Sequence, residues 1–343
     1  MSDQAPGKSA DLPSPPAPSS RRVFAERAGL FGALLLLILV FGSLSNSFFS
    51  LRTLVSIANQ IPDLTLLAVG LTLVLISGGI DLSVGSVLAL CSAVIGVAMV
   101  DGNFSLGTAA LFALTAGAIC GLVSGSITVL AGLPSFIVTL ATLFMVRGLT
   151  IAAARGFTRR TQLGGLDDVV GYELARTAFG SAPVGGLRIS IVWWLGCAAL
   201  ATWVLLRTPW GNWILAAGGQ PEAARNVGVR VARVKIGLFM TSALCACLVG
   251  IIQAVRFAGA DALRGQLQEF YAIIAVVIGG TLLTGGYGTI VGAVFGALIF
   301  GMVRQGIVMT GIDADWFQVF LGGMLLLAVF VNRYALVRAQ RAP

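Results

Sequence analysis

Long apolar segments alternate with short polar ones along most of the chain. Each apolar segment approaches the roughly 20 residues that a helix needs to cross a bilayer. The segments lie at residues 28–44, 54–76, 84–100, 106–130, 136–154, 189–206, 236–255, 270–283, 290–310 and 316–331. This pattern predicts an all-α fold, a polytopic membrane helical bundle of about ten transmembrane helices. The 44 glycines indicate close helix packing and broken helices, both frequent in membrane bundles.

One polar and basic interval, residues 216–235, stands between two apolar segments. Pro221 suits a first helical position, Glu222 the positive end of the helix dipole, and Gly228 a C-terminal stop. The interval therefore predicts a short helix of about two turns outside the membrane. The alternative is an ordinary cytoplasmic loop whose basic residues only set the orientation of the spans: Arg225, Arg230, Arg233 and Lys235.

The composition excludes an ordinary soluble domain. Apolar residues make up 57% of the chain and charged residues 10%, whereas soluble domains are typically about 45–50% apolar. The net charge of +8 would favour nucleic acid as a partner of a soluble chain, but here the basic residues cluster between spans and at the tails, where they set orientation. The expected surroundings are a lipid membrane, and no nucleic acid is expected.

The sequence offers no set of residues typical of an enzyme or a metal site. It contains no histidine, and its five cysteines lie in apolar segments without a Cys-x-x-Cys pair. It also lacks the GxxxxGK[ST] phosphate loop, so the chain cannot hydrolyse ATP by that mechanism. We expect no cofactor, no metal and no enzymatic activity on this chain.

An even number of spans places both ends of the chain on the same side of the membrane. Residues 1–27 are rich in Pro, Ser and Ala and predict a disordered cytoplasmic tail, residues 28–335 the transmembrane domain, and residues 336–343 a second cytoplasmic tail. The basic residues of both tails and of 207–235 then face the cytoplasm, as the positive-inside rule requires. Residues 155–188 form the largest loop on the opposite side.

The second span contains Pro62 beside Asp63, flanked by Asn59 and Gln60. Proline frees a backbone carbonyl, and polar groups at that depth need protein or water around them. Two interpretations are open: a simple kink that faces a neighbouring helix, or a discontinuous helix that lines a water-filled path.

Two glycine motifs occur where apolar segments meet. Asp81 is costly in lipid, so we expect it to cap the helix after a tight reversal. A related pattern of an apolar run, Gly-Gly, a polar turn and a glycine-spaced helix returns late in the chain and allows a parallel structural repeat. The motif residues are Gly78, Gly79, Asp81, Ser83 and Gly85, and then Gly279, Gly280, Gly285 and Gly286.

Four ordered stretches, 77–90, 132–140, 218–228 and 269–298, together resemble the permease subunits of bacterial ATP-binding-cassette importers of ribose, xylose and arabinose. The resemblance covers about residues 30–335. It implies an inner-membrane permease domain that works as a homodimer or pseudo-dimer. It also implies a periplasmic sugar-binding protein that delivers a monosaccharide, and a cytoplasmic ATPase subunit that binds ATP and Mg²⁺.

The same resemblance places the interval 216–235 as the coupling loop that docks on the ATPase. Its docking residues would be Gly219, Gln220, Glu222, Ala223, Ala224, Arg225, Asn226 and Gly228. Gly219-Gln220 and Asn226-Val227 depart from the common family pattern, which leaves the side-chain contacts open. Glu269 matches an acidic position at the start of the eighth span, whereas Tyr271 stands where the family often has an acid.

A neutral sugar needs groups that match its hydroxyls and an aromatic wall more than it needs charge. The candidate substrate path comprises Asn59, Gln60, Thr65, Phe136, Thr139, Thr142, Gln253 and Gln305, although each of these types also occurs as a helix-packing residue. A nucleoside or autoinducer permease is the near alternative. An ion-coupled secondary transporter would need buried carboxylates, for which Asp63 and Asp81 are the close candidates.

Overall fold

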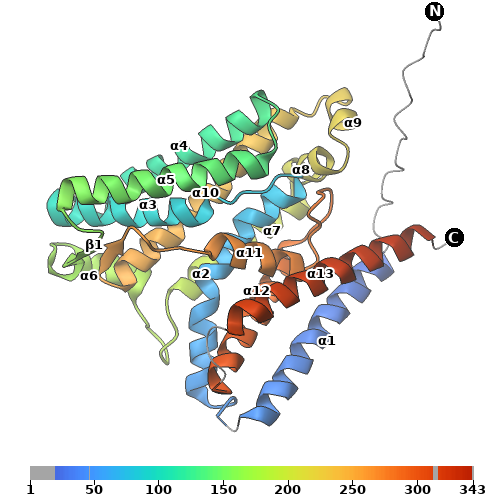
Figure 1. Cartoon of the computed structure of the whole chain (residues 1–343), viewed down its shortest axis with the longest axis horizontal. Helices are drawn as coiled ribbons and strands as arrows, with labels where there is room; N and C mark the ends of the chain where they lie inside the picture. Colours follow the sequence, from blue (N-terminus) through green and yellow to red (C-terminus); the bar gives the residue numbers. More distant parts are fainter. Residues whose placement is uncertain (1–19, 46, 312–315, 342–343) are drawn as a thin grey trace, which may run out of the picture.

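A computed structural model of the chain describes residues 20–45, 47–311 and 316–341. It is almost entirely helical (Figure 1). The helices of the first half are α1 (Ser20–Leu44), α2 (Leu51–Ile76), α3 (Val84–Gly96), α4 (Leu106–Leu130), α5 (Ser135–Thr158) and α6 (Tyr172–Ala175). Those of the second half are α7 (Ser190–Arg207), α8 (Pro209–Gly219), α9 (Pro221–Asn226), α10 (Val231–Arg256), α11 (Gln268–Ile278), α12 (Ile290–Met309) and α13 (Trp316–Arg341).

Among the described residues, eight helices are long and apolar enough to cross a membrane. Two shorter apolar helices, Gly29–Leu44 within α1 and Gln268–Ile278, make up the rest of the predicted set. The all-α polytopic bundle is therefore confirmed, with a count of roughly ten. Helix α4 has the predicted bounds of 106–130, whereas α11 ends at Ile278, before the expected residue 283.

The helices extend further toward the two ends of the chain than the sequence predicted. Helix α1 begins at Ser20, inside the segment assigned to a disordered tail, and α13 continues to Arg341, through most of the segment assigned to the second tail. Residues 20–27 and 336–341 of the two assigned tails are therefore helical. Residues 1–19 and 342–343 lie outside the described residues.

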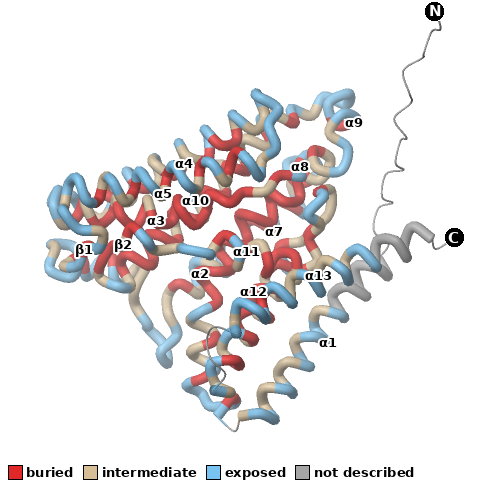
Figure 2. Tube along the Cα trace, in the orientation of Figure 1, coloured by how far each residue is buried: buried red, intermediate tan, exposed pale blue. Residues whose placement is uncertain are grey.

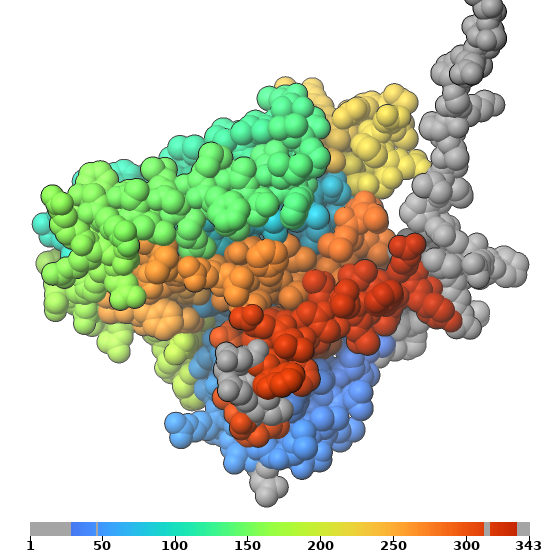
Figure 3. All heavy atoms as spheres, in the orientation of Figure 1, coloured from blue at the N-terminus to red at the C-terminus, as the bar shows by residue number. Residues whose placement is uncertain are grey.

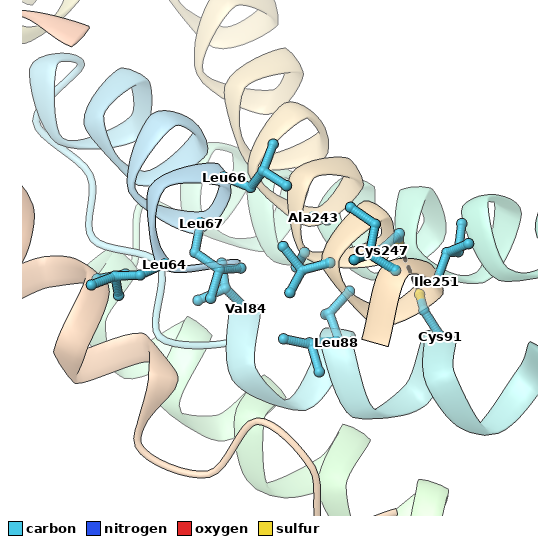
Figure 4. Packing of buried hydrophobic residues seen from close by; sticks show 14 of the residues in the cluster. Leu64, Leu66, Leu67, Val84, Leu88, Cys91, Ala243, Cys247 and Ile251 are labelled. Atoms are coloured by element: carbon cyan, nitrogen blue, oxygen red, sulfur yellow. Dashed lines mark hydrogen bonds between the residues drawn. The ribbon is translucent and has the colours of Figure 1, made fainter. Parts of the chain in front are cut away.

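Helices α2, α3 and α10 form the centre of the bundle (Figure 2). Within the most apolar stretch of each helix, 89% of α2 lies inside the protein but only 22% of α4, so α4 presents most of its surface outward. Figure 4 shows leucines of α2, such as Leu67, packed against Leu88 of α3 and Ala243 of α10. Movement of α10 therefore has to be accommodated by α2 and α3.

Helix α4 lies against α10 through three glycines spaced four residues apart. A Cβ atom at Gly117 would overlap the sulfur of Cys247. At Gly121 it would lie 2.7 Å from the Cα of Met240, and at Gly125 3.0 Å from the Cα of Ile236. The two main chains can approach this closely only because these residues have no side chain.

Helix α2 is continuous through Pro62, so of the two open interpretations the discontinuous helix is wrong. Pro62 and Asp63 are both buried in the bundle. Pro62 itself therefore lies in protein surroundings, where a proline within a transmembrane helix is tolerated.

The break in the helical spans lies instead before α11. There β2 (Gly259–Asp261) pairs antiparallel with β1 (Gln162–Gly164), and the following residues run along α3 toward its start. Arg264 donates to the Oγ of Ser92 at 3.1 Å. A Cβ atom at Gly85 would lie 2.5 Å from the carbonyl oxygen of Gly265. This segment of strand and turns and α11 together make one broken span, which we define as residues 259–278.

The space-filling view places the broken span on the face shown in Figure 3. Its orange surface lies between the green surface of α5 and the red surface of α12 and α13. Two opposite sides of the bundle are also visible in Figure 1. Helix α9, the beginning of α1 and the end of α13 lie toward the upper right, and β1, α6 and the beginning of α2 toward the lower left. We call these the α9 side and the β1 side.

Candidate functional site

The polar interval folds as the short helix that its local signals predict. Pro221 occupies the first turn of α9 with Glu222 beside it. Gly228 has a φ of 88°, a conformation that glycine adopts without steric cost, and its N–H donates to the carbonyl of Arg225 at 3.0 Å. The chain then turns into α10, so α9 is a rigid corner between α8 and a long central helix.

Helix α9 is seated on the bundle by one small side chain. Ala224 is 3% exposed and packs in a cluster with Ile214 of α8 and with Val231 and Val234 of α10. The other predicted docking residues are exposed: Gly219, Gln220, Glu222, Ala223, Arg225, Asn226 and Gly228. One face of α9 thus holds the helix in place, and the remaining surface is open to a partner.

The two glycine motifs and the end of α8 meet in direct main-chain contact. The Gly286 N–H donates to the Ile76 carbonyl at 2.8 Å. A Cβ atom at Gly218 would overlap that same carbonyl and would lie 2.8 Å from the Gly286 nitrogen. A Cβ atom at Gly285 would lie 2.7 Å from the Cα of Gly78. We call the contacting residues the glycine junction: Gly78, Gly218, Gly219, Gly285 and Gly286.

The remaining motif glycines lie at other helix contacts. Gly79 lies against the ring of Phe239, and Gly85 against the carboxylate of Glu269. Gly279 lies against the main chain of Gly292, where α11 packs on α12, whereas Gly280 has a φ of 86° and open space beside it. Glu269, in the first turn of α11, is 4% exposed, so its carboxyl group lies in the interior rather than at an external docking surface.

Asp81 stabilises the turn between α2 and α3 from inside the protein. Its Oδ1 accepts hydrogen bonds from the Ser83 N–H at 2.9 Å and from the Ser83 hydroxyl at 2.6 Å. The residue that caps α3 is Ser83, so the expectation that Asp81 is the cap was wrong. Asp81 acts one step earlier, because it holds the capping residue in position.

The eight residues of the predicted substrate path do not form one cluster. Thr65, Thr139 and Thr142 are buried and donate to carbonyls of their own helices, four residues earlier. Phe136 is half exposed on α5. Asn59 holds the loop before α7, because its amide donates to the Gly186 carbonyl at 2.8 Å and accepts from the Arg188 N–H at 2.9 Å.

Several path residues also bond to a side chain on another helix. Thr142 of α5 accepts from the Ser124 hydroxyl of α4 at 3.1 Å. Gln60 of α2 donates to Gln305 of α12 at 2.8 Å, and Gln253 of α10 donates to Asp63 of α2 at 2.8 Å. Asp63 also forms an ion pair with Arg256 at 3.0 Å. No local pattern in the sequence indicates this pair, because Asp63 and Arg256 lie on helices far apart in the chain.

A cation close to this ion pair changes its electrostatic surroundings. The Arg188 guanidinium lies on the β1 side, in the loop before α7. Partial burial lowers its pKa, and the nearby positive charge of Arg256 lowers it further, while Asp63 opposes the shift. The polar cluster at the C-terminal end of α10 therefore contains the Asp63–Arg256 ion pair and, close to it, the second positive charge of Arg188.

Residues 53–329 match the family described as "Branched-chain amino acid transport system / permease component". The chain belongs to this permease family. The permease is 37% identical over 321 residues to the ribose import permease protein of Escherichia coli (strain K12), an alignment that covers 92% of this chain and 97% of the relative. No solved structure matches it significantly.

Two further relatives of the permease are named for different substrates. It is 34% identical over 310 residues to the ribose import permease protein of Bacillus subtilis (strain 168), covering 90% of this chain and 93% of the relative. It is 34% identical over 304 residues to an autoinducer 2 import system permease protein of Photorhabdus laumondii, covering 87% of each. These matches confirm the resemblance that the four sequence stretches indicated.

Membership of this family shows which part of the transport system this chain is. The chain is the membrane-spanning permease component, and ATP hydrolysis belongs to a separate subunit. An import permease of this class works with that ATPase and with a binding protein. The structure adds where α9, the glycine junction and the polar cluster lie in this subunit.

Proposed function

We propose that the chain is the permease of an ATP-driven importer that moves a monosaccharide, a ribose-like pentose or a hexose, into the cytoplasm. Support for the solute comes from the two ribose import permeases, which align over 90% or more of this chain. The autoinducer 2 relative, at 34% identity, keeps autoinducer import as the second candidate within the same class.

The proposed mechanism rests on how α9 is attached to the bundle, through the buried side chain of Ala224. This helix stands outside the candidate spans, is held at Ala224, and exposes the rest of its surface. In the proposed cycle, ATP closes the partner ATPase dimer and α9 moves with it. Helices α8 and α10 then rock with α9, and the path through the bundle changes its open side.

We place the α9 side in the cytoplasm. The positive-inside rule supports this orientation, because Arg225, Arg230, Arg233 and Lys235 gather there. Both ends of the described chain then face the cytoplasm of a bacterial cell, and the β1 side faces the periplasm, where the binding protein would dock. The working unit would be a homodimer in the inner membrane, with each copy supplying one α9.

The polar groups on the helix faces are the proposed sugar contacts. Gln60 with Gln305, and Gln253 with Asp63, offer donors and acceptors within the bundle that can exchange their mutual hydrogen bonds for sugar hydroxyls. The pairing argues against an ion-coupled transporter. Asp63 is bound by Arg256 and Asp81 by Ser83, so neither carboxylate is a free carrier.

The test replaces one exposed residue of α9. Ala223→Trp places a bulky ring on the docking face and leaves Ala224 seated, so the complex should assemble poorly with the ATPase and lose most sugar uptake. The control is Phe144→Trp, at a position on α5 that is 66% exposed. This variant should keep both assembly with the ATPase and sugar uptake. Coupled uptake at the full rate by Ala223→Trp would overturn the proposal.

The solute can be identified with the same reconstituted complex. Proteoliposomes that contain the permease, its ATPase and its binding protein would be given radiolabelled ribose, with unlabelled pentoses, hexoses or autoinducer 2 as competitors. We expect a pentose or hexose to be taken up. Competition by autoinducer 2 alone would favour the second candidate.

A further inference from the structure

We propose that the glycine junction is a second coupling element, through which Gly218 passes the movement of α9 to the broken span. The proposal rests on the function proposed above, because it assigns a further step to that transport cycle. In this view Gly218 and Gly286 are positioning residues: they touch neither sugar nor nucleotide, and they set the place of α11 relative to α9.

The first step of the argument is the position of the junction. Gly218 and Gly219 are the last residues of α8, and α9 begins at Pro221. Any displacement of α9 is therefore delivered almost directly to Gly218. Gly218 in turn lies against two segments that are distant in sequence, the end of α2 at Ile76 and the loop between α11 and α12 at Gly286.

The second step concerns the stiffness of the contact. At the junction, peptide groups touch peptide groups, and the Gly286 N–H is bonded to the Ile76 carbonyl at 2.8 Å. A side-chain contact can absorb a small shift by changing rotamer, whereas a main-chain contact has no such freedom. A push on Gly218 should therefore displace Ile76 and Gly286 instead of being lost locally.

The third step concerns the loop between α11 and α12, which connects Gly286 to both helices. The loop is braced by bonds from the Leu282 N–H to the Tyr287 carbonyl at 3.1 Å and from the Gly285 N–H to the Leu282 carbonyl at 3.2 Å. Helices α11 and α12 lie close together, since a Cβ atom at Gly296 would overlap the Ala275 carbonyl. The loop and both helices should thus move as one unit.

The moving unit contains the helical half of the broken span. Helix α11 has only 11 residues and is preceded by turns at residues 262–267, so it is less constrained along its axis than a full-length span. The movement of α9 is transmitted directly to α10, and through the glycine junction it would also be transmitted to α11. Coupling at both places explains why the two glycine motifs face the end of α8.

The test compares Gly218 of α8 with Gly196, a glycine inside α7. Gly218→Ala would push a methyl group into the Ile76 carbonyl, whereas a Cβ atom at Gly196 would have no atom within 4 Å. Both substitutions raise helix propensity equally. In the complete complex of permease, ATPase and binding protein, one would measure sugar uptake and ATP hydrolysis together.

We expect Gly218→Ala to lower the sugar transported per ATP by about tenfold, while Gly196→Ala stays within about twofold of the unmodified permease. Equal ratios for the two variants would overturn the proposal. If the unmodified complex transported sugar without ATP, the proposed function itself would fail, which is a different result from equal ratios in a working importer.

Hydrogen exchange provides a second measurement in the unmodified complex, in case Gly218→Ala does not assemble. Trapping the ATPase with ATP and vanadate should change the exchange of the loop 279–289 together with that of α9. In Gly218→Ala, the change at α9 should remain and the change in the loop should disappear. If hydrogen exchange of the loop 279–289 in the unmodified complex were the same with and without the trapped nucleotide, the proposal would be contradicted.

Discussion

Asp63 and Arg256 form an ion pair inside the bundle, with 3.0 Å between the carboxylate Oδ2 and the guanidinium Nη2. The pair joins the middle of α2 to the C-terminal end of α10, and each side chain is only 12% exposed. Gln253 donates to the same carboxylate oxygen at 2.8 Å. Helix α10 is thus held at its last residue by the ion pair with α2 and near its first residues by the cluster around Ala224 of α9.

Removal of one partner should cost far more than removal of both. Asp63→Leu leaves the Arg256 guanidinium buried without its carboxylate, and we expect the permease to lose about 3–5 kcal/mol of stability. Adding Arg256→Met removes the stranded charge and should restore most of the loss. The midpoint of thermal unfolding in detergent measures the loss of stability in Asp63→Leu and its recovery in the double variant. A double variant as unstable as Asp63→Leu would show that the pair is not the cause.

Arg147 should stabilise the non-helical half of the broken span, residues 259–267. Its guanidinium donates to the Arg264 carbonyl at 2.6 Å, and burial of that carbonyl without a partner would cost about 1–3 kcal/mol. Arg147→Met should lower the unfolding midpoint accordingly. The control is Arg155→Met, on the exposed surface of the same helix, which should change it little. Equal midpoints for the two variants would contradict this role.

The close approach of α4 to α10 gives a prediction about glycine. Gly121→Ala introduces a Cβ 2.7 Å from main-chain atoms of Met240 and Phe239, and overpacking of this kind costs typically about 1–3 kcal/mol. Gly107→Ala, at the start of the same helix, has its nearest atom 4.0 Å away. Thermal unfolding should separate the two variants. Loss of stability only in Gly107→Ala would reverse the interpretation.

The sequence predicts features that depend on local signals. Pro221, Glu222 and Gly228 define α9 because each acts within a few residues of its own position. The bounds of α4 follow from hydropathy in the same way. A contact such as that of Gly286 with Ile76 depends instead on how distant segments pack, and a glycine pattern does not contain that information.

The place of the helix break shows how tertiary surroundings override a local signal. Pro62 is the stronger breaker by residue type, yet α2 continues through it, since the helix is enclosed by protein. The actual break, before α11, has strand pairing and the guanidinium of Arg264 to satisfy its backbone groups. Among the path residues, the buried threonines bond within their own helices, an outcome that polarity alone did not distinguish from a cavity lining.

The orientation of the permease can be tested with two exposed valines on opposite sides. Val170, in the loop region next to α6, is 94% exposed, and Val227, just after α9, is 80% exposed. A cysteine introduced by Val170→Cys should react with a membrane-impermeant maleimide in intact spheroplasts. One introduced by Val227→Cys should react only after the membrane is opened, because its side faces the cytoplasm. The unmodified chain, whose own five cysteines are buried or half-buried, measures the background. Labelling of Val227→Cys in closed spheroplasts would reverse the topology, and α9 could then not meet a cytoplasmic ATPase.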